Sequence, residues 1–290
     1  MSFQLVKQIK GDDTLRKSFF HLALQTFGLS FESWYQQGFW TESYIPYTWV
    51  RDNQVLANAS VNLMPFIYNG QPRFYIQIGT VMTHPQYRNF GLARSLIQEI
   101  IRDWNERSDA IYLFANDTVL DFYPKFGFQK AQEFQYKMSV VPKEGDFILL
   151  NMQNKRHQEE IHRLCQFPNP YSILSMYRQY GLLMFYCSSL FKDCVYYSPK
   201  YETVCIAAKV QDSFYCYDIL RKPSPELSLQ SLMAELAFPG VQEVILGFTP
   251  EDLTNCLCNP LTGEDTLFLL KDQENLFSQT KAMFPILSHA

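Results

Sequence analysis

The spacing of hydrophobic and polar positions changes several times along the chain, and each spacing predicts one type of element. Between residues 92 and 104 apolar residues recur every three to four positions with charged residues between them, which predicts an amphipathic helix. Residues 55–68 and 73–83 read as strands, and Asn69-Gly70 joins them. This dipeptide favours a hairpin because both positions of a type I′ turn need positive φ. The sequence therefore predicts an antiparallel meander followed by a helix.

The same criteria predict further elements on both sides of this segment. In the first half they are a short strand at 4–10, helices at 15–27 and 31–40, strands at 47–51, 111–115 and 134–141, a small helix at 118–125 and a linker at 142–146. In the second half they are helices at 155–165, 170–190 and 228–237, and strands at 194–198, 203–210, 213–220, 243–248 and 266–270. The second half partly repeats the element order of the first, which is compatible with a divergent duplicate.

Composition supports a folded chain with two domains. The 290 residues are 47% hydrophobic and 16% aromatic, so the chain can bury enough apolar surface to offset the entropy of ordering. At about 150 residues per domain the length suggests two domains. All four Trp lie in the first half and all seven Cys in the second. We therefore expect one domain over residues 1–141 and another over 147–290.

Charge and cysteine content exclude several classes of function. The net charge is -4, and neither half is strongly basic, so we expect no nucleic-acid partner. No apolar run is long enough to span a bilayer, and the first residues lack the apolar core of a signal peptide. We expect a cytoplasmic protein with no membrane partner. The odd number of cysteines, without C-x-x-C pairs, predicts reduced and mostly buried thiols, with no metal site.

One segment, Gly79 to Ser95, has a pattern that indicates chemistry. It consists of a predicted strand, a loop with the spacing Arg88-x-x-Gly91-x-Ala93, and the amphipathic helix. Free N–H groups in the first turn of a helix, together with the positive end of its dipole, form a site for an anion such as phosphate. G-x-G-x-x-G and Gly-Lys-Ser/Thr are both absent, so neither a Rossmann fingerprint nor a P-loop is present. A simple turn with a helix cap is the alternative.

With Phe122-Tyr123-Pro-Lys-Phe-Gly127-Phe128 some thirty residues later, this segment resembles the GCN5-related N-acetyltransferase (GNAT) superfamily. The resemblance covers residues 1–141, where the predicted order of elements also matches. It implies a mixed α/β fold with a mainly antiparallel sheet flanked by helices, beside a second, smaller α/β domain that we interpret as a degenerate GNAT-like repeat. It also implies acetyl-CoA as the co-substrate.

The resemblance assigns roles to individual residues. The loop and first helical turn, which would bind the CoA pyrophosphate, comprise Arg88, Asn89, Phe90, Gly91, Leu92, Ala93 and Arg94. Val81, Met82 and Thr83 would hold the pantetheine arm by strand-like pairing, and Asn116 would contact CoA. Tyr123 corresponds to the general acid, and the N–H of Val81 to the donor for the thioester carbonyl. Gly79 suggests a β-bulge that splays the sheet.

The resemblance does not identify the general base in the same way. Histone-modifying relatives have a glutamate eleven positions before the loop, where this chain has Gln77. The alternatives are a water relay, Glu32 or Glu42. The chain also resembles the enhanced-intracellular-survival-type aminoglycoside acetyltransferases in combining a GNAT domain with a C-terminal domain. Those enzymes use their terminal carboxylate, which makes the carboxylate of Ala290 a further candidate.

These inferences lead to two hypotheses of function. The first is an acetyl-CoA-dependent N-acetyltransferase that acts on a primary amine, of a small molecule or a peptide, by direct attack in a ternary complex. The second is a non-catalytic acyl-CoA-binding sensor or interaction protein. The second domain would wall the acceptor site or form a homodimer; its own loop, Lys222 to Ser228, has two prolines and no glycine and should not bind CoA. Aromatic residues that would build the acceptor pocket are Phe31, Trp34, Tyr35, Phe39, Trp40, Tyr44, Tyr47 and Trp49.

Overall fold

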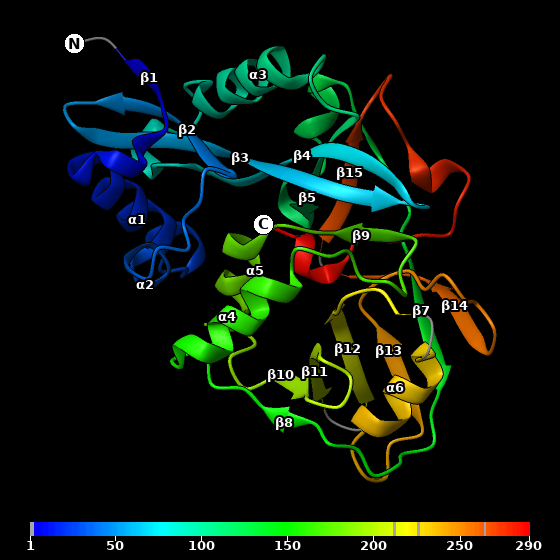
Figure 1. The fold of residues 1–290 in the computed structure, drawn as a ribbon. Coiled ribbons are helices and arrows are strands. Elements are labelled where there is room, and N and C mark those ends of the chain that lie inside the picture. Colours follow the sequence, from blue (N-terminus) through cyan, green and yellow to red (C-terminus); the bar gives the residue numbers. More distant parts are fainter. Residues whose placement is uncertain (1–2, 211–212, 225–226, 264) are drawn as a thin grey trace.

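Two mainly antiparallel sheets form the framework of the computed structural model, which describes residues 3–210, 213–224, 227–263 and 265–290 (Figure 1). In order across the first sheet the strands are β1 (Gln4–Lys7), β2 (Tyr44–Arg51), β3 (Gln54–Tyr68), β4 (Gln71–Thr83), β5 (Ala110–Asn116), β15 (Asp265–Leu270) and β6 (Phe128–Lys130), and β9 (Leu174–Met176) pairs with β3. Across the second they are β14 (Cys256–Pro260), β7 (Phe134–Ser139), β13 (Glu243–Leu246), β12 (Ser213–Leu220), β11 (Thr203–Val210), β10 (Val195–Ser198) and β8 (Ile148–Leu149).

Six helices cover these sheets. They are α1 (Asp13–Phe27), α2 (Glu32–Gln36), α3 (Leu92–Trp104), α4 (Lys155–Leu164), α5 (Tyr180–Cys187) and α6 (Leu229–Leu236). Helices α1 and α3 lie on opposite faces of the first sheet, since α1 packs with Val55 and α3 with its neighbour Leu56 (Figure 1). In the part of the chain that is described, no helix is both long and apolar enough to cross a bilayer.

The fold class predicted from the sequence is confirmed. The hairpin at Asn69-Gly70 joins β3 and β4 with positive φ at both residues. The predicted helix at 170–190 is wrong in its first part, where the chain forms β9 before α5 begins. Strand β3 extends beyond its pairing with β2, so residues 66–68 offer unpaired backbone groups, and β9 pairs with them. All seven cysteines are free and four are buried.

The two halves of the chain exchange strands, which the sequence did not reveal. We expected residues 134–141 to close the first domain, but β7 lies in the second sheet between β13 and β14. Its buried side chains, Tyr136 and Met138, belong to the core of that sheet. In return β15 lies in the first sheet between β5 and β6. The sheets therefore do not divide at residues 141–147.

The second sheet repeats part of the arrangement of the first. Strands β12 and β13 are parallel and lie on either side of α6 in sequence, as β4 and β5 are parallel on either side of α3. A duplication would produce this arrangement, so common descent of the two halves stays a prediction. In the loop before α6, residues 225 and 226 lie outside the described residues, and Ser228 caps the helix with its side-chain oxygen.

Candidate active site

A cavity of about 1110 Å³ lies where β4 and β5 separate. The two strands pair only from Tyr75 to Ile78 and from Ala110 to Leu113. Beyond that point β4 continues beside β3, while β5 continues beside β15. The edges of both strands then face the cavity.

The predicted site residues gather around this cavity. Those that line it are Val81, Met82, Thr83, Arg88, Asn89, Gly91, Leu92, Ala93, Arg94, Asn116 and Tyr123. Phe90 is the exception: its side chain is 66% exposed and its ring lies 6.2 Å from that of Tyr87, outside the cavity. The other residues of the loop line the cavity, whereas its exposed aromatic residue does not face it.

A β-bulge shapes β4 at the cavity. Ser60 of β3 pairs with Gly79 and Asn58 pairs with Met82, so β4 has one extra residue here. Thr80 has a φ of +50°, which is unfavourable for a β-branched residue and must be held by its neighbours. The bulge expected from Gly79 is present, and the residue with unusual backbone geometry is Thr80.

Three buried polar side chains hold this bulge. Asn58 donates from Nδ2 to the carbonyl of Thr80 at 2.8 Å and to Oγ of Ser60 at 2.9 Å. The hydroxyl of Ser60 donates to that of Tyr44 at 2.9 Å, and Tyr44 donates to Oγ1 of Thr80 at 3.0 Å. Both the backbone and the side chain of Thr80 are therefore fixed. This network orients the backbone of Val81, the next residue.

The loop before α3 presents a row of free donors. Gly91 is the N-cap of α3 with a φ of +76° and makes no side-chain cap. The first helical bond runs from the N–H of Ser95 to the carbonyl of Gly91, so within the described part of the chain the N–H groups of residues 92–94 have no partner. Arg88 and Arg94 add positive charge. Such a loop fits a pyrophosphate.

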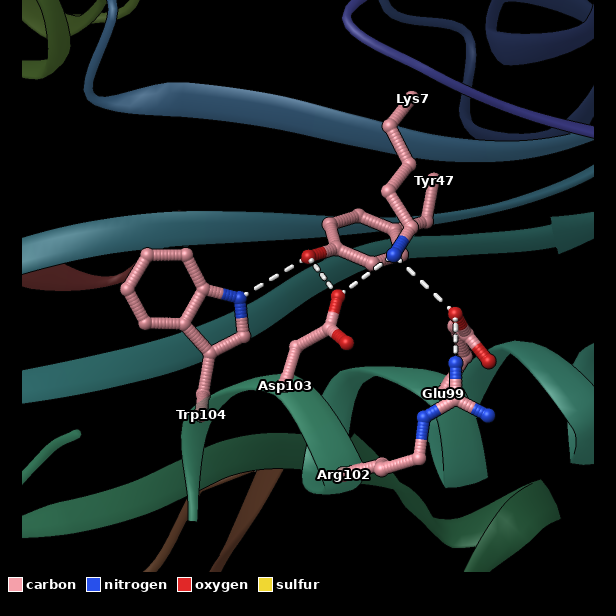
Figure 2. Close-up of polar contacts among 6 residues, drawn as sticks. All are labelled: Lys7, Tyr47, Glu99, Arg102, Asp103 and Trp104. Carbon is pink, nitrogen blue, oxygen red and sulfur yellow. Dashed lines mark hydrogen bonds and ion pairs between the residues drawn. The ribbon is translucent and has the colours of Figure 1, made fainter. Parts of the chain in front are cut away.

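A polar network in the C-terminal half of α3 anchors this helix to β1 and β2 (Figure 2). Lys7 donates to Asp103 at 2.6 Å and to Glu99 at 3.1 Å, and the hydroxyl of Tyr47 donates to Asp103 at 2.8 Å. The indole of Trp104 donates to Tyr47 at 3.0 Å. Burial alone would raise the pKa of Asp103, but the hydrogen bonds from Lys7 and Tyr47 outweigh it and lower that pKa. The network fixes the helix whose N-terminus faces the cavity.

Tyr123 lies in an apolar environment at the cavity. Its side chain is 5% exposed, and its ring lies 5.9 Å from that of Phe268 and 6.2 Å from that of Phe128. Burial raises the pKa of Tyr123 to about 12, so its hydroxyl stays protonated at neutral pH. Among the residues described, none forms a hydrogen bond with this hydroxyl, which leaves it available to a ligand.

The last residues of the chain reach the cavity from the second half. The N–H of Phe284 donates to Glu133 at 2.7 Å, and the ring of Phe284 stacks on that of Tyr112 with centroids 4.0 Å apart. The His289 ring stacks on Phe114 at 3.7 Å, and burial lowers its pKa to about 4. Figure 1 shows this end at the centre of the molecule, beside α5. The order of the tail depends on both halves of the chain.

Ala290 itself lies against Gly79. A Cβ built on Gly79 would lie 2.3 Å from the backbone oxygen of Ala290. Of the candidate bases, Ala290 is thus beside β4. Glu32 accepts a hydrogen bond from Gln36, Glu42 pairs with Lys10, and neither lines the cavity, so their predicted placement is wrong. Both lie on the surface of the α1–α2 region, where water solvates their charge.

Gln77 occupies the position of the expected glutamate. It is 1% exposed and lines the cavity, and in the described structure its Oε1 has no hydrogen-bond partner. Its backbone carbonyl accepts from Asn62 at 3.4 Å. A buried amide cannot accept a proton from an amine, so Gln77 offers a hydrogen bond and no base.

Aromatic side chains from both halves form a wall of the cavity. Of the predicted cluster, Phe31, Trp34 and Tyr44 line it. The others pack in the cores or bond elsewhere: Tyr35, Phe39, Trp40, Tyr47 and Trp49. Sequence reasoning missed the contribution of α5, namely Leu182, Phe185 and Tyr186. The indole of Trp34 donates to the carbonyl of Gly181 at 2.7 Å and so fixes α5 against α2.

Comparison with known proteins agrees with this geometry. Residues 15–128 match the family model described as the acetyltransferase (GNAT) family. This segment contains the loop, the bulge and Tyr123. No curated protein matches the chain in sequence.

Solved structures share the fold over nearly the whole chain. A conserved protein of unknown function from Enterococcus faecalis V583, described as a "probable N-acyltransferase", has a TM-score of 0.62 at 15% identity, and the match covers 93% of this chain and 72% of that one. A GCN5-related N-acetyltransferase from Kribbella flavida has a TM-score of 0.55 at 14% identity, covering 92% and 71%. The Eis1 protein of Mycobacterium abscessus has a TM-score of 0.54 at 12% identity, covering 92% and 73%. At these identities the likeness concerns the fold.

Proposed function

We propose that the protein transfers an acetyl group from acetyl-CoA to a primary amine, because residues 15–128 match the GNAT acetyltransferase family model. The observation that supports this most is the meeting of three groups at one cavity: the donor loop at residues 88–94, the hydroxyl of Tyr123 and the backbone end at Ala290. A fold alone would not assign a reaction. In a chain that ends at Ala290, these three groups match the three needs of acyl transfer: a donor site, an acid and a base.

The donor part of the proposal uses backbone groups. The free N–H groups of residues 92–94 and the side chains of Arg88 and Arg94 would bind the pyrophosphate. The open edge of β4 from Val81 to Thr83 would pair with the amides of the pantetheine arm. The N–H of Val81, oriented by the bulge, would donate to the thioester carbonyl as negative charge develops on its oxygen.

The chemical step then needs two proton transfers. The amine nitrogen forms a bond to the acetyl carbon while the bond from that carbon to sulfur breaks. In a chain that ends at Ala290, the terminal carboxylate would accept the proton that the amine loses. Tyr123 would give its proton to the departing sulfur, since burial keeps its hydroxyl protonated. Gln77 is then needed only to bind and orient.

The sensor hypothesis holds that the same donor site binds acyl-CoA but that no acetyl group is transferred. Gln77 favours it because this position has no glutamate that could act as a base. Release of CoA from acetyl-CoA in the presence of a panel of primary amines distinguishes the two. Turnover with any amine supports the transferase, whereas tight binding of acetyl-CoA with no turnover contradicts it. A cytoplasmic location and a homodimer remain predictions.

Calorimetric titration with acetyl-CoA tests the donor site separately. Gly91→Glu places a carboxylate at the expected phosphate position and should weaken binding by roughly tenfold or more. Gly70→Glu is the matched control, because Gly70 has nearly the same φ, +75°, and equally open surroundings, but lies in the β3–β4 turn. Equal affinity of the two variants would contradict the assignment of the loop.

A further inference from the structure

The acceptor end of the cavity has a composition that restricts which amines it can hold. We propose that the acceptor is a primary amine on an aromatic or aliphatic body without a second charge. This inference rests on the proposed acetyl transfer and concerns the same site. It follows from which side chains surround residue 290 and from where the charged residues of the cavity lie.

Aromatic rings lead from the bulge into the second half of the chain. The hydroxyl of Tyr44 bonds to Thr80, which fixes the ring of Tyr44 beside the place of acyl transfer. Phe31 stacks on Tyr44 with centroids 6.1 Å apart and on Phe185 of α5 at 5.5 Å. All three rings line the cavity. They form a continuous apolar surface that begins at the donor strand.

Side chains of α5 lie beside the residue that precedes Ala290. The hydroxyl of Tyr186 donates to the backbone carbonyl of His289, so the ring of Tyr186 lies next to the end of the chain. Leu182, one turn earlier on α5, also lines the cavity. Phe31, Phe185 and Leu182 line the same cavity as residue 290, and they offer apolar surface to the body of an amine that gives its proton there.

The charged side chains of the cavity lie at its donor end. Among the described lining residues the one acidic side chain is that of Asp265, which is paired across the sheet with Asn116 of β5. The arginines, Arg88 and Arg94, belong to the anion loop. Among the described residues, the acceptor end thus offers an amine residue 290 and neutral polar groups such as Oε1 of Gln77. A second ammonium group would lose its hydration there without meeting a carboxylate side chain.

Exposed apolar side chains also lie at the end of α1, next to the cavity. Phe27 at the end of α1 lines the cavity and is 44% exposed, and Leu24, one turn earlier, is 52% exposed. An apolar body that extends out of the cavity would cover this surface. Aromatic faces also attract a single ammonium group before it loses its proton. The wall and these exposed side chains therefore fit an amine with one charge and a large apolar part.

Matched amines test the proposal directly. Hexylamine and 1,6-diaminohexane have the same chain length and differ by one ammonium group; 2-phenylethylamine adds an aromatic body, and kanamycin represents polycations. Binding to the CoA-saturated protein is measured by calorimetry, and kcat/KM by CoA release. We expect hexylamine and 2-phenylethylamine to bind at least about tenfold more tightly than 1,6-diaminohexane and kanamycin. We expect their kcat/KM to be higher by at least about the same factor.

The outcomes separate this proposal from the proposed function. If the affinity and kcat/KM of the diamine or of kanamycin equal those of the monoamines, the proposed acceptor class is wrong. The proposal of acetyl transfer is then still supported. If no amine is acetylated, the proposed function fails, and the binding series still decides the acceptor class. Absence of binding by all four amines contradicts the acceptor class.

A pair of variants links the preference to α5. Leu182→Glu places a carboxylate at the acceptor end and should raise the ratio of diamine to hexylamine turnover by about tenfold. Leu190→Glu is the control, because Leu190 is 63% exposed and does not line the cavity. Affinity for acetyl-CoA, measured on both, shows whether each variant is folded. An unchanged ratio in folded Leu182→Glu would overturn the proposal.

Discussion

The Cα of Gly79 lies so close to the backbone of Ala290 that a Cβ at Gly79 would be 2.3 Å from the oxygen and 2.9 Å from the carbonyl carbon of Ala290. One residue lies within β4, and the other is at the end of the segment that follows β15. Glycine at position 79 therefore makes room for residue 290 as well as for the bulge. The proposed base depends on this contact.

Substituting Gly79 by alanine should displace residue 290 and disturb catalysis. We expect kcat/KM for amine acetylation to fall by about a hundredfold, because a base that moves by an ångström loses its geometry. Gly11→Ala is the control, since no heavy atom lies within 4 Å of its Cβ and its φ is not positive. Steady-state assays of both variants measure the effect, and equal rates would contradict the role of the contact.

Tyr123→Phe should keep the fold and lose most of the turnover. The ring contacts with Phe128 and Phe268 remain, while the proton donor is removed, so kcat should fall by about 10²-fold or more. Because burial raises the pKa of Tyr123 to about 12, the wild-type rate should show no loss from this group up to about pH 11. An unchanged kcat in the folded variant would remove Tyr123 from the mechanism.

Asn58→Ala should affect both stability and catalysis through the bulge. It removes the donor to the carbonyl of Thr80, and we expect the free energy of unfolding to fall by about 1–3 kcal/mol. It should also lower kcat, because Thr80 and the N–H of Val81 lose their support. Thr48→Val removes a comparable buried bond, to Val6 at 2.8 Å, away from the cavity, and should lower stability alone. Similar kcat values for the two variants would contradict a positioning role for Asn58.

Glu133 should make the stability of the tail depend on pH. Burial raises the pKa of Glu133 from 4.5 to about 8, so between these values the folded protein binds more protons than the unfolded chain. The stability from this group is therefore full below about pH 4.5 and is lost as pH rises through about 8. Glu133→Gln, which keeps an acceptor for the N–H of Phe284, should flatten the decline of the melting temperature between about pH 5 and pH 9. Parallel curves for both proteins would contradict the predicted contribution.

Local sequence signals were sufficient to predict the elements around the proposed donor site. The spacing of Arg88, Gly91 and Ala93 before an amphipathic helix, and the turn at Asn69-Gly70, depend on a few neighbouring residues, and the structure forms the expected elements there. Tyr123 was found through the motif that contains it. Each of these features depends on residues that are close together in the sequence, within about one helix, strand or turn.

The acceptor side depends on contacts between distant parts of the chain. Nothing local distinguishes a strand of the first sheet from one of the second, so β7 was assigned to the wrong sheet and the insertion of β15 beside β5 was missed. The apolar residues of α5, such as Phe185, read as an ordinary buried helix until Gly181 and Trp34 place them at the cavity. From the sequence, Gly79 was expected only to form a β-bulge. Its contact with Ala290 could not be predicted, because it depends on how the whole segment after β15 folds.

The central claim is that a carboxylate at residue 290 accepts the proton of the amine, and replacing that carboxylate tests it most directly. The chain ending at Ala290 is compared with the same chain ending in a carboxamide, which differs by one terminal group and preserves the contact with Gly79. We predict that kcat for the best amine falls by about 10²-fold or more while the affinity for acetyl-CoA is unchanged. An unchanged kcat for the carboxamide protein would contradict the claim.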